Sequence, residues 1–151
     1  MSFSDLYFSP RGRIPRSTWW IGVIGLVVWN VVVFFILWTV LGPKLYLTFV
    51  GRLFGFAFNV LNIYLAYNVA VKRFNDRERA VVNAQAVAAF WGFKSVTDLF
   101  RITGDPWAQN WMDKLFLLGG TAIGLWYFIE LGCMRGTVGP NAHGEDPVRD
   151  S

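Results

Sequence analysis

Residues 18–41 read TWWIGVIGLVVWNVVVFFILWTVL, a run without one charged side chain, and this run decides the fold. As a helix it is about 36 Å long, enough to cross a hydrocarbon core of about 30 Å with some tilt. A secretory signal peptide has a shorter apolar core and a small-residue cleavage site, and the sequence has neither. We therefore predict an uncleaved transmembrane helix at 18–41, preceded by a cytoplasmic segment at 1–17.

Two further segments predict a second and a third span. Residues 53–71 are uncharged and would form about 28 Å of helix. Residues 80–100 are a weaker candidate, because only 80–93 is free of charge. The third helix reaches membrane length only if Lys94 extends its ammonium group to the interface. A re-entrant or interfacial helix at 80–100 therefore remains an alternative to a full span.

A fourth span is predicted inside a long helix at 107–134. Asp105 suits the N-cap and Pro106 the first helical position. Residues 135–151 are rich in Gly, Pro, Asn and Asp and predict a loop-like tail. The whole chain is then one domain at 1–151, an all-α integral membrane protein built as a bundle of four transmembrane helices.

Composition supports this class and excludes others. Apolar residues make up 54% of the chain and charged residues 16%, against about 25% charged in a soluble domain. The net charge of +4 sits at the ends of apolar segments, where lipid headgroups explain it better than nucleic acid does. With one cysteine and one histidine, we expect no metal, no cofactor and no catalytic residue.

The basic residues also predict the orientation. Nine of them fall on the side of the two termini and the middle loop, and five on the other side. Because positively charged loops stay in the cytoplasm, both termini and the middle loop are predicted to be cytoplasmic. The nine are Arg11, Arg13, Arg16, Lys72, Arg73, Arg77, Arg79, Arg135 and Arg149, and the five are Lys44, Arg52, Lys94, Arg101 and Lys114.

Some residues within the predicted spans are candidates for helix contacts. Gly51 with Gly55, and Gly120 with Gly124, have the four-residue spacing that lets two helix backbones approach in lipid. These contacts could form within the molecule or with a partner. Glu130 is an acid within the predicted fourth span, and it either pairs with a loop arginine or handles protons or cations.

Three short stretches carry a resemblance to a known family. They are GRIPRSTWW at 12–20, KRFNDR at 72–77 and GTVGPNAHGEDP at 136–147. In this order they resemble the small bacterial inner-membrane proteins known as domain of unknown function 805. That family has a G-R-x-x-R-x-x-[FW]-W opening, an R-R-L-H-D loop and a G-T-x-G-x-N-x-x-G-x-D-P tail. The chain departs from the loop pattern at Lys72, Phe74 and Asn75, so any task of the family's histidine is lost here.

The three stretches also suggest a site. All of them are predicted on the cytoplasmic side. There the guanidinium groups of the arginines need hydrogen-bond acceptors, and the carboxylates can serve as those acceptors. We expect a polar cap that closes the bundle, and phosphate groups of anionic lipids could share its arginines. The candidate residues are Arg13, Arg16, Arg73, Asp76, Arg77, Glu130 and Asp146, with Glu145 as a further acceptor.

The resemblance implies a bacterial inner-membrane protein but no activity. The sequence favours a non-catalytic accessory or scaffold subunit that binds a larger, conceivably energy-transducing, membrane complex. The predicted partners are anionic lipids and other membrane subunits, and no soluble small-molecule substrate is evident. A small oligomeric transporter or channel is the alternative, with a route lined by Asn59, Asn62, Asn68, Asn83, Gln85 and Glu130. An intramembrane enzyme would have only Asp76, Glu130 and His143 for acid–base chemistry.

Overall fold

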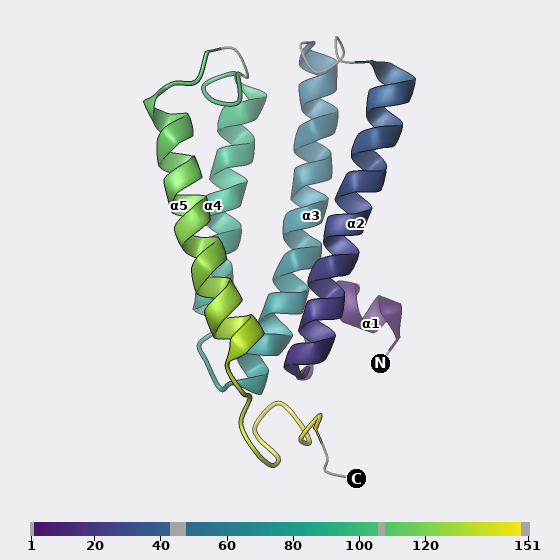
Figure 1. Cartoon of the computed structure of the whole chain (residues 1–151), viewed down its shortest axis with the longest axis vertical. Helices are drawn as coiled ribbons and strands as arrows, with labels where there is room; N and C mark the ends of the chain where they lie inside the picture. The colour runs from purple at the N-terminus through teal and green to yellow at the C-terminus, as the bar shows by residue number, and fades with distance from the viewer. Residues whose placement is uncertain (1, 43–47, 106–107, 149–151) are drawn as a thin grey trace.

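The computed structural model describes residues 2–42, 48–105 and 108–148, and the regular elements within them are all helices (Figure 1). The first long helix, α2 (Arg16–Leu41), covers the predicted span and has no charged residue after Arg16. Its outer half presents apolar side chains at the surface, among them Phe35 and Val40. Such a surface is suited to lipid rather than to water.

Among the described residues, three helices are long and apolar enough to cross a membrane. They are α2, α3 (Phe49–Asp76), and α5 (Trp111–Tyr127) extended by the π-helical turn η2 (Phe128–Cys133). The predicted all-helical class is therefore confirmed, and three of the four predicted spans lie in helices suited to a membrane by length and composition. The Thr48 hydroxyl caps the start of α3 by accepting from the Gly51 amide at 3.0 Å.

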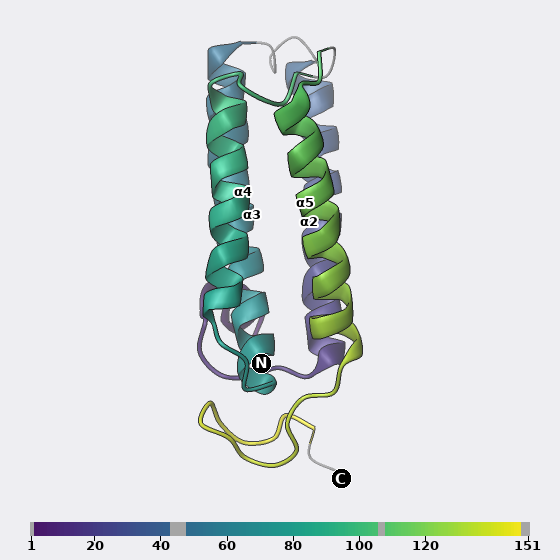
Figure 2. The ribbon, with the colours of Figure 1, turned by 90° about the vertical axis from the view of Figure 1, so that its left-hand side faces the viewer.

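The weak third segment forms one continuous helix, α4 (Val82–Leu99). It packs antiparallel to α3 and runs beside it along the bundle (Figures 1 and 2). Its 18 residues correspond to about 27 Å, slightly less than a hydrocarbon core. It includes Lys94 and Asp98 as well as the polar Asn83 and Gln85, and it is not among the helices that length and composition mark as spans.

The fourth long helix begins later than predicted. Asn110 is the N-cap of α5, and the Asn110 and Asp113 side chains accept from each other's backbone amides in a capping box. This reciprocal pair satisfies the free amides of the first turn, so the helix begins at Trp111 and not at 107. The expected first helical position, Pro106, and the predicted start of the long helix at 107 lie outside the described residues.

The bundle is closed at one end and open at the other. In Figure 1, α2 and α5 lie close together at the lower end and far apart at the upper end. The buried apolar core lies at the closed end and includes Ile14, Trp19, Val69, Phe74 and Leu131. The closed end therefore holds the tertiary structure together, while much of the open half is exposed.

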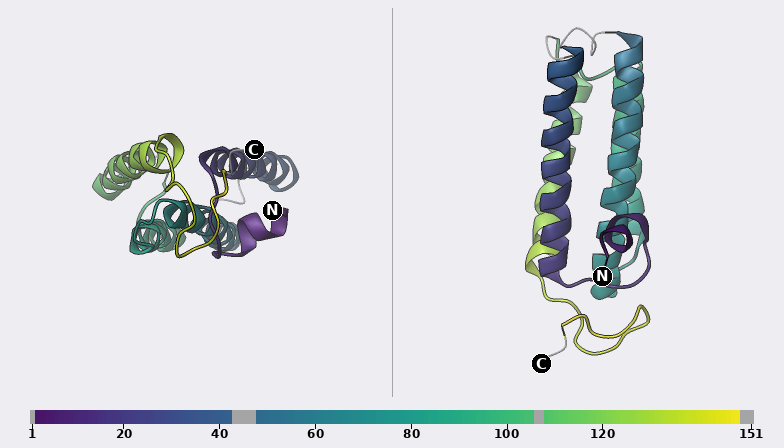
Figure 3. Two further views of the ribbon diagram at one scale, coloured as in Figure 1. Left: turned by 90° about the horizontal axis from the view of Figure 1, so that it is seen from below. Right: turned by 90° about the vertical axis from the view of Figure 1, so that its right-hand side faces the viewer.

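A short helix that the sequence did not predict, α1 (Phe3–Phe8), lies against the side of α3 (Figure 3). Asn68 donates to the Tyr7 carbonyl at 2.8 Å, and the Tyr7 hydroxyl donates to the Gly22 carbonyl at 2.9 Å. The buried Lys72 ammonium donates to the carbonyls of Asp5 and Leu6. A cation at a helix C-terminus complements the helix dipole, which ties α1 to α3.

Candidate functional site

The three stretches singled out in the sequence meet at the closed end of the bundle. The segment before α2, the last turn of α3 and the tail after η2 lie together there (Figures 1 and 3). We call this assembly the polar cap and define it by Arg13, Arg73, Asp76, Arg77 and Glu130. These are five of the seven predicted site residues.

Asp76 lies at the centre of the polar cap. Its Oδ1 accepts from Arg13 Nε at 2.9 Å and its Oδ2 accepts from Arg73 Nη1, and all three side chains are almost fully buried. Gly136 packs so closely on this carboxylate that a Cβ at that position would overlap it. A glycine is therefore required where the tail crosses Asp76.

Arg73 connects four parts of the chain. Besides Asp76, its guanidinium donates to the Leu131 carbonyl at 2.8 Å, to the Ile14 carbonyl at 3.5 Å and to the Met134 carbonyl. These carbonyls belong to η2, to the segment before α2 and to the start of the tail. A planar fork with five donors can serve all of them at once, which a lysine ammonium cannot do.

The tail is folded back on the polar cap. Arg13 donates to the Thr137 carbonyl at 2.6 Å and to the Gly139 carbonyl at 2.9 Å. In return the Thr137 amide and hydroxyl donate to the Asp76 carbonyl, at 2.8 and 2.9 Å. Asn141 adds a hydrogen bond to the Asn75 carbonyl at 3.0 Å. The tail is thus an ordered part of the site.

Glu130 is paired with two arginines at the closed end of the bundle. Its Oε1 lies 3.2 Å from Arg77 Nη2 and 3.2 Å from Arg79 Nε. Arg77 was one of its expected partners, whereas Arg79 was not proposed as a site residue. With these pairs, four guanidiniums surround the two carboxylates of Asp76 and Glu130, so the polar cap keeps a positive excess.

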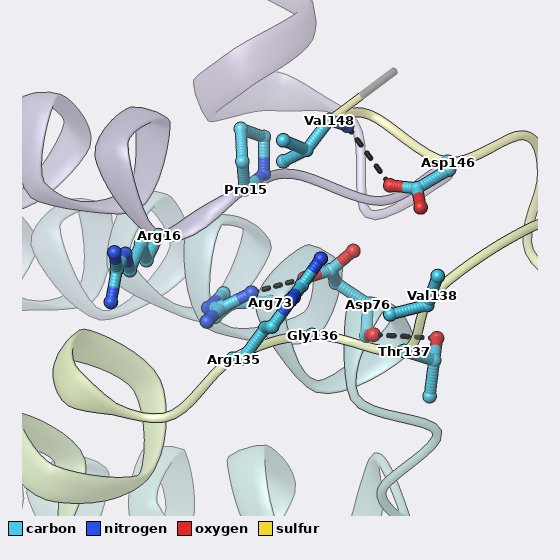
Figure 4. A pocket seen from close by; sticks show the side chains of 10 residues that line it. All are labelled: Pro15, Arg16, Arg73, Asp76, Arg135, Gly136, Thr137, Val138, Asp146 and Val148. Carbon is cyan, nitrogen blue, oxygen red and sulfur yellow. Dashed lines mark hydrogen bonds and ion pairs between the residues drawn. The ribbon is translucent and has the colours of Figure 1, made fainter. Parts of the chain in front are cut away.

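The remaining two predicted residues line a pocket beside the polar cap. Arg16 is exposed and makes no ion pair within the described part of the chain. Asp146 accepts from the amides of Val148 at 2.9 Å and Gly139 at 2.8 Å, and these hydrogen bonds lower the pKa of its carboxyl below the usual value. Arg135 lines the same pocket and was not proposed from the sequence (Figure 4).

The residues that depart from the family pattern have structural contacts. Phe74 is fully buried and packs on Trp126 and Tyr127. Asn75 donates to the Gly12 carbonyl at 3.0 Å, and its own Oδ1 is buried without a hydrogen bond in the described structure. His143 is exposed in the tail, where its amide donates to Asn141.

The candidate glycines divide into two kinds. Gly120 faces α4, and a Cβ there would lie 2.8 Å from the Trp91 ring, while Gly51 is buried at the start of α3. At Gly55 and Gly124 a Cβ would meet no other atom within 4 Å. Gly120 therefore serves packing within the molecule, and Gly55 and Gly124 leave space on its surface.

The comparisons with known proteins agree with the resemblance. A family model described as "Protein of unknown function (DUF805)" matches residues 7–145. No curated protein and no solved structure matches the chain. Within residues 2–42, 48–105 and 108–148, no three His, Cys, Asp or Glu side chains gather as ligands for a metal ion.

Proposed function

This chain belongs to the DUF805 family of proteins of unknown function, and because the family carries no assigned activity, we propose a function from the fold and the polar cap. The protein is a non-catalytic, four-span protein of the bacterial inner membrane with both termini in the cytoplasm. It serves as an accessory subunit, and its folded tail is the surface that meets a larger membrane complex.

The observation that carries this proposal is that both carboxylates of the polar cap are held in ion pairs. Asp76 is held by two arginines, and Glu130 is held by two others. A general acid or base needs a carboxyl that is poised to exchange a proton, and these two are fixed as ion-pair acceptors. Asp76 and Arg13 hold the tail in one conformation, and Glu130 ties η2 to the end of α3, which together support a binding surface.

The tail offers that surface. Val138 is 73% exposed and Val148 is 56% exposed, both on a segment held by hydrogen bonds to the polar cap. An ordered loop loses little conformational entropy when a partner binds it. The basic residues at this end support its placement in the cytoplasm.

The test is purification in a mild detergent followed by native electrophoresis. We expect other membrane subunits to co-purify with the wild-type chain, and to be lost from Val138→Asp. The matched control is Ile102→Asp, which changes an exposed apolar residue at the opposite end. A chain that runs alone as a monomer or homodimer contradicts the proposal.

A second candidate is the small transporter, and one observation favours it. A cavity of about 530 Å³ lies between α2, α3, α4 and the end of α5. Among its lining residues are Asn59 and Asn62 of the expected route, together with Asn30, Lys94, Ser95 and Asp98. Of the other residues of the expected route, Asn68 is hydrogen-bonded to the Tyr7 carbonyl of α1, and Glu130 forms an ion pair in the polar cap.

Cysteine labelling separates this candidate from the first. With Cys133 replaced by Ser, we expect Asn59→Cys to react with a water-soluble thiosulfonate only if the cavity holds water. Val60→Cys, at the neighbouring exposed apolar position, is the control and should not react. Absence of reaction at both positions contradicts an aqueous route.

A further inference from the structure

Two arginines at the closed end take no part in the polar cap. Arg16 and Arg135 are both exposed. Within residues 2–42, 48–105 and 108–148, neither side chain makes a salt bridge or a hydrogen bond, and Arg135 acts on the Asp146 carboxylate only at longer range. Arg13 and Arg73, by contrast, donate to carboxylates and carbonyls on several sides, and Arg77 donates to the Glu130 carbonyl and pairs with the Glu130 carboxylate.

Both arginines line one pocket of about 240 Å³ between the start of α2, the end of α3 and the tail (Figure 4). Asp76 and Asp146 also line it, but two guanidiniums hold Asp76 and two backbone amides hold Asp146. The pocket lining thus carries three guanidiniums (Arg16, Arg73 and Arg135) and two carboxylates, so its net charge is +1. An anion would complete the arrangement.

The start of α2 adds to this positive potential. Arg16 is the first residue of the 26-residue helix, which has no side-chain cap and no acidic residue in its first turn. A cation is unfavourable at a helix N-terminus unless an anion compensates it. Arg16 directly precedes the charge-free run of α2, where lipid headgroups would meet the end of a span.

We propose that this pocket binds a phosphate group, with Arg16 and Arg135 as its ligands. Guanidinium forks match phosphate oxygens in geometry and keep their charge at any physiological pH. The phosphate comes either from an anionic lipid headgroup or from a free phosphate ion. The lipid source rests on the proposed cytoplasmic placement of the polar cap.

The test uses the purified full chain in neutral detergent and measures its melting temperature against added ligand. The probes are phosphatidylglycerol, phosphatidylcholine and inorganic phosphate at constant ionic strength. Arg16→Gln/Arg135→Gln removes the site, and Arg101→Gln/Lys114→Gln removes the same charge from exposed positions at the opposite end. We expect the site variant to need about 30-fold more phosphatidylglycerol for half of the stabilisation.

The two sources give different results. Stabilisation by phosphatidylglycerol but not by inorganic phosphate supports a headgroup site, and stabilisation by both supports a site for any phosphate. Without ligand, the site variant should have the melting temperature of the wild type, because neither arginine makes a hydrogen bond or a salt bridge within the protein. The proposal is overturned if both double variants lose the same amount of stabilisation by phosphatidylglycerol. It is also overturned if neither phosphatidylglycerol nor inorganic phosphate stabilises the wild-type chain. The accessory-subunit proposal is tested by co-purification and is unaffected by this result.

Discussion

Arg73 illustrates at the scale of one residue how the closed end is held. We expect Arg73→Lys to lower the free energy of unfolding by about 1.5–3 kcal/mol, because an ammonium keeps the charge but not the bonds to three separate carbonyls. Unfolding of the purified chain by sodium dodecyl sulfate measures this. Arg16→Lys, at an exposed position, is the control, and an equal effect of both changes would contradict the role given to Arg73.

Asp146 makes the docking of the tail depend on pH. Amide hydrogen bonds from Val148 and Gly139 lower the pKa of its carboxyl in the folded state. Its stabilising contribution is therefore complete above the unfolded pKa of about 4 and is lost as pH falls through the lower, folded pKa. We expect pepsin to cleave the wild-type tail increasingly as pH drops below about 4.

The control for this pH dependence is Asp146→Asn. This variant lacks the titrating carboxylate, so its tail should already be cleaved at pH 4–5, where the wild-type tail is protected. Equal protection of both chains at that pH would mean that Asp146 does not hold the tail.

At the scale of the element, the end of α3 explains why Arg79 was not foreseen as a site residue. Glu78 has a φ of +52°, and the amides of Glu78 and Arg79 donate to the Asn75 and Phe74 carbonyls. This is a Schellman helix end, which sequences usually mark with glycine. Because glutamate occupies the left-handed position, nothing in the sequence signals the turn that brings Arg79 to Glu130.

The same turn provides a stability test. Glu78→Gly should raise the free energy of unfolding by about 1 kcal/mol, since glycine adopts positive φ without the steric cost of a Cβ. Glu78→Ala is the control, because it removes the same carboxylate but keeps the Cβ. If both changes have the same effect, the backbone conformation at 78 is not responsible.

The contact between α4 and α5 gives a second test at this scale. Gly120→Leu would drive the side chain into the Trp91 ring and should destabilise the protein by about 1–3 kcal/mol. Gly124→Leu, one turn further along the same helix, meets open space and should be tolerated. Equal melting temperatures of the two variants would show that the helices do not pack as described.

At the scale of the whole molecule, the sequence predicted the helices better than their connections. Long uncharged runs define α2 and α3, because a lipid-solvated helix must be apolar over its length. The short α1 was missed, since Tyr7 and Asn68 reveal their contact only once α3 is in place. The arginines of the polar cap were found from the three family-like stretches, but the sequence could not separate Arg13, which binds Asp76 and the tail, from Arg16, which makes no ion pair.

Topology is the prediction that belongs to this scale. With Cys133 replaced by Ser, we place single cysteines at Ser4, Glu78 and Ala108, which are all exposed. An impermeant maleimide should label positions 4 and 78 from the cytoplasmic side and position 108 from the opposite side, because four crossings alternate. Labelling of positions 78 and 108 from the same side would mean that α4 does not cross.

Because η2 is a π-helical turn, the number of residues in it sets the direction in which the tail leaves the last helix. The carbonyls of Glu130, Leu131 and Gly132 accept from Arg77, Arg73 and Trp20, so three consecutive peptide groups face three different partners. A π-turn holds one residue more than the α-helix it interrupts. Deleting any residue of 128–133 would restore ordinary winding and rotate everything downstream by about 100°. The loss of a single codon here would turn the tail away from its contacts with Arg13 and Asp76. The helix itself would still be long enough to reach across the bilayer.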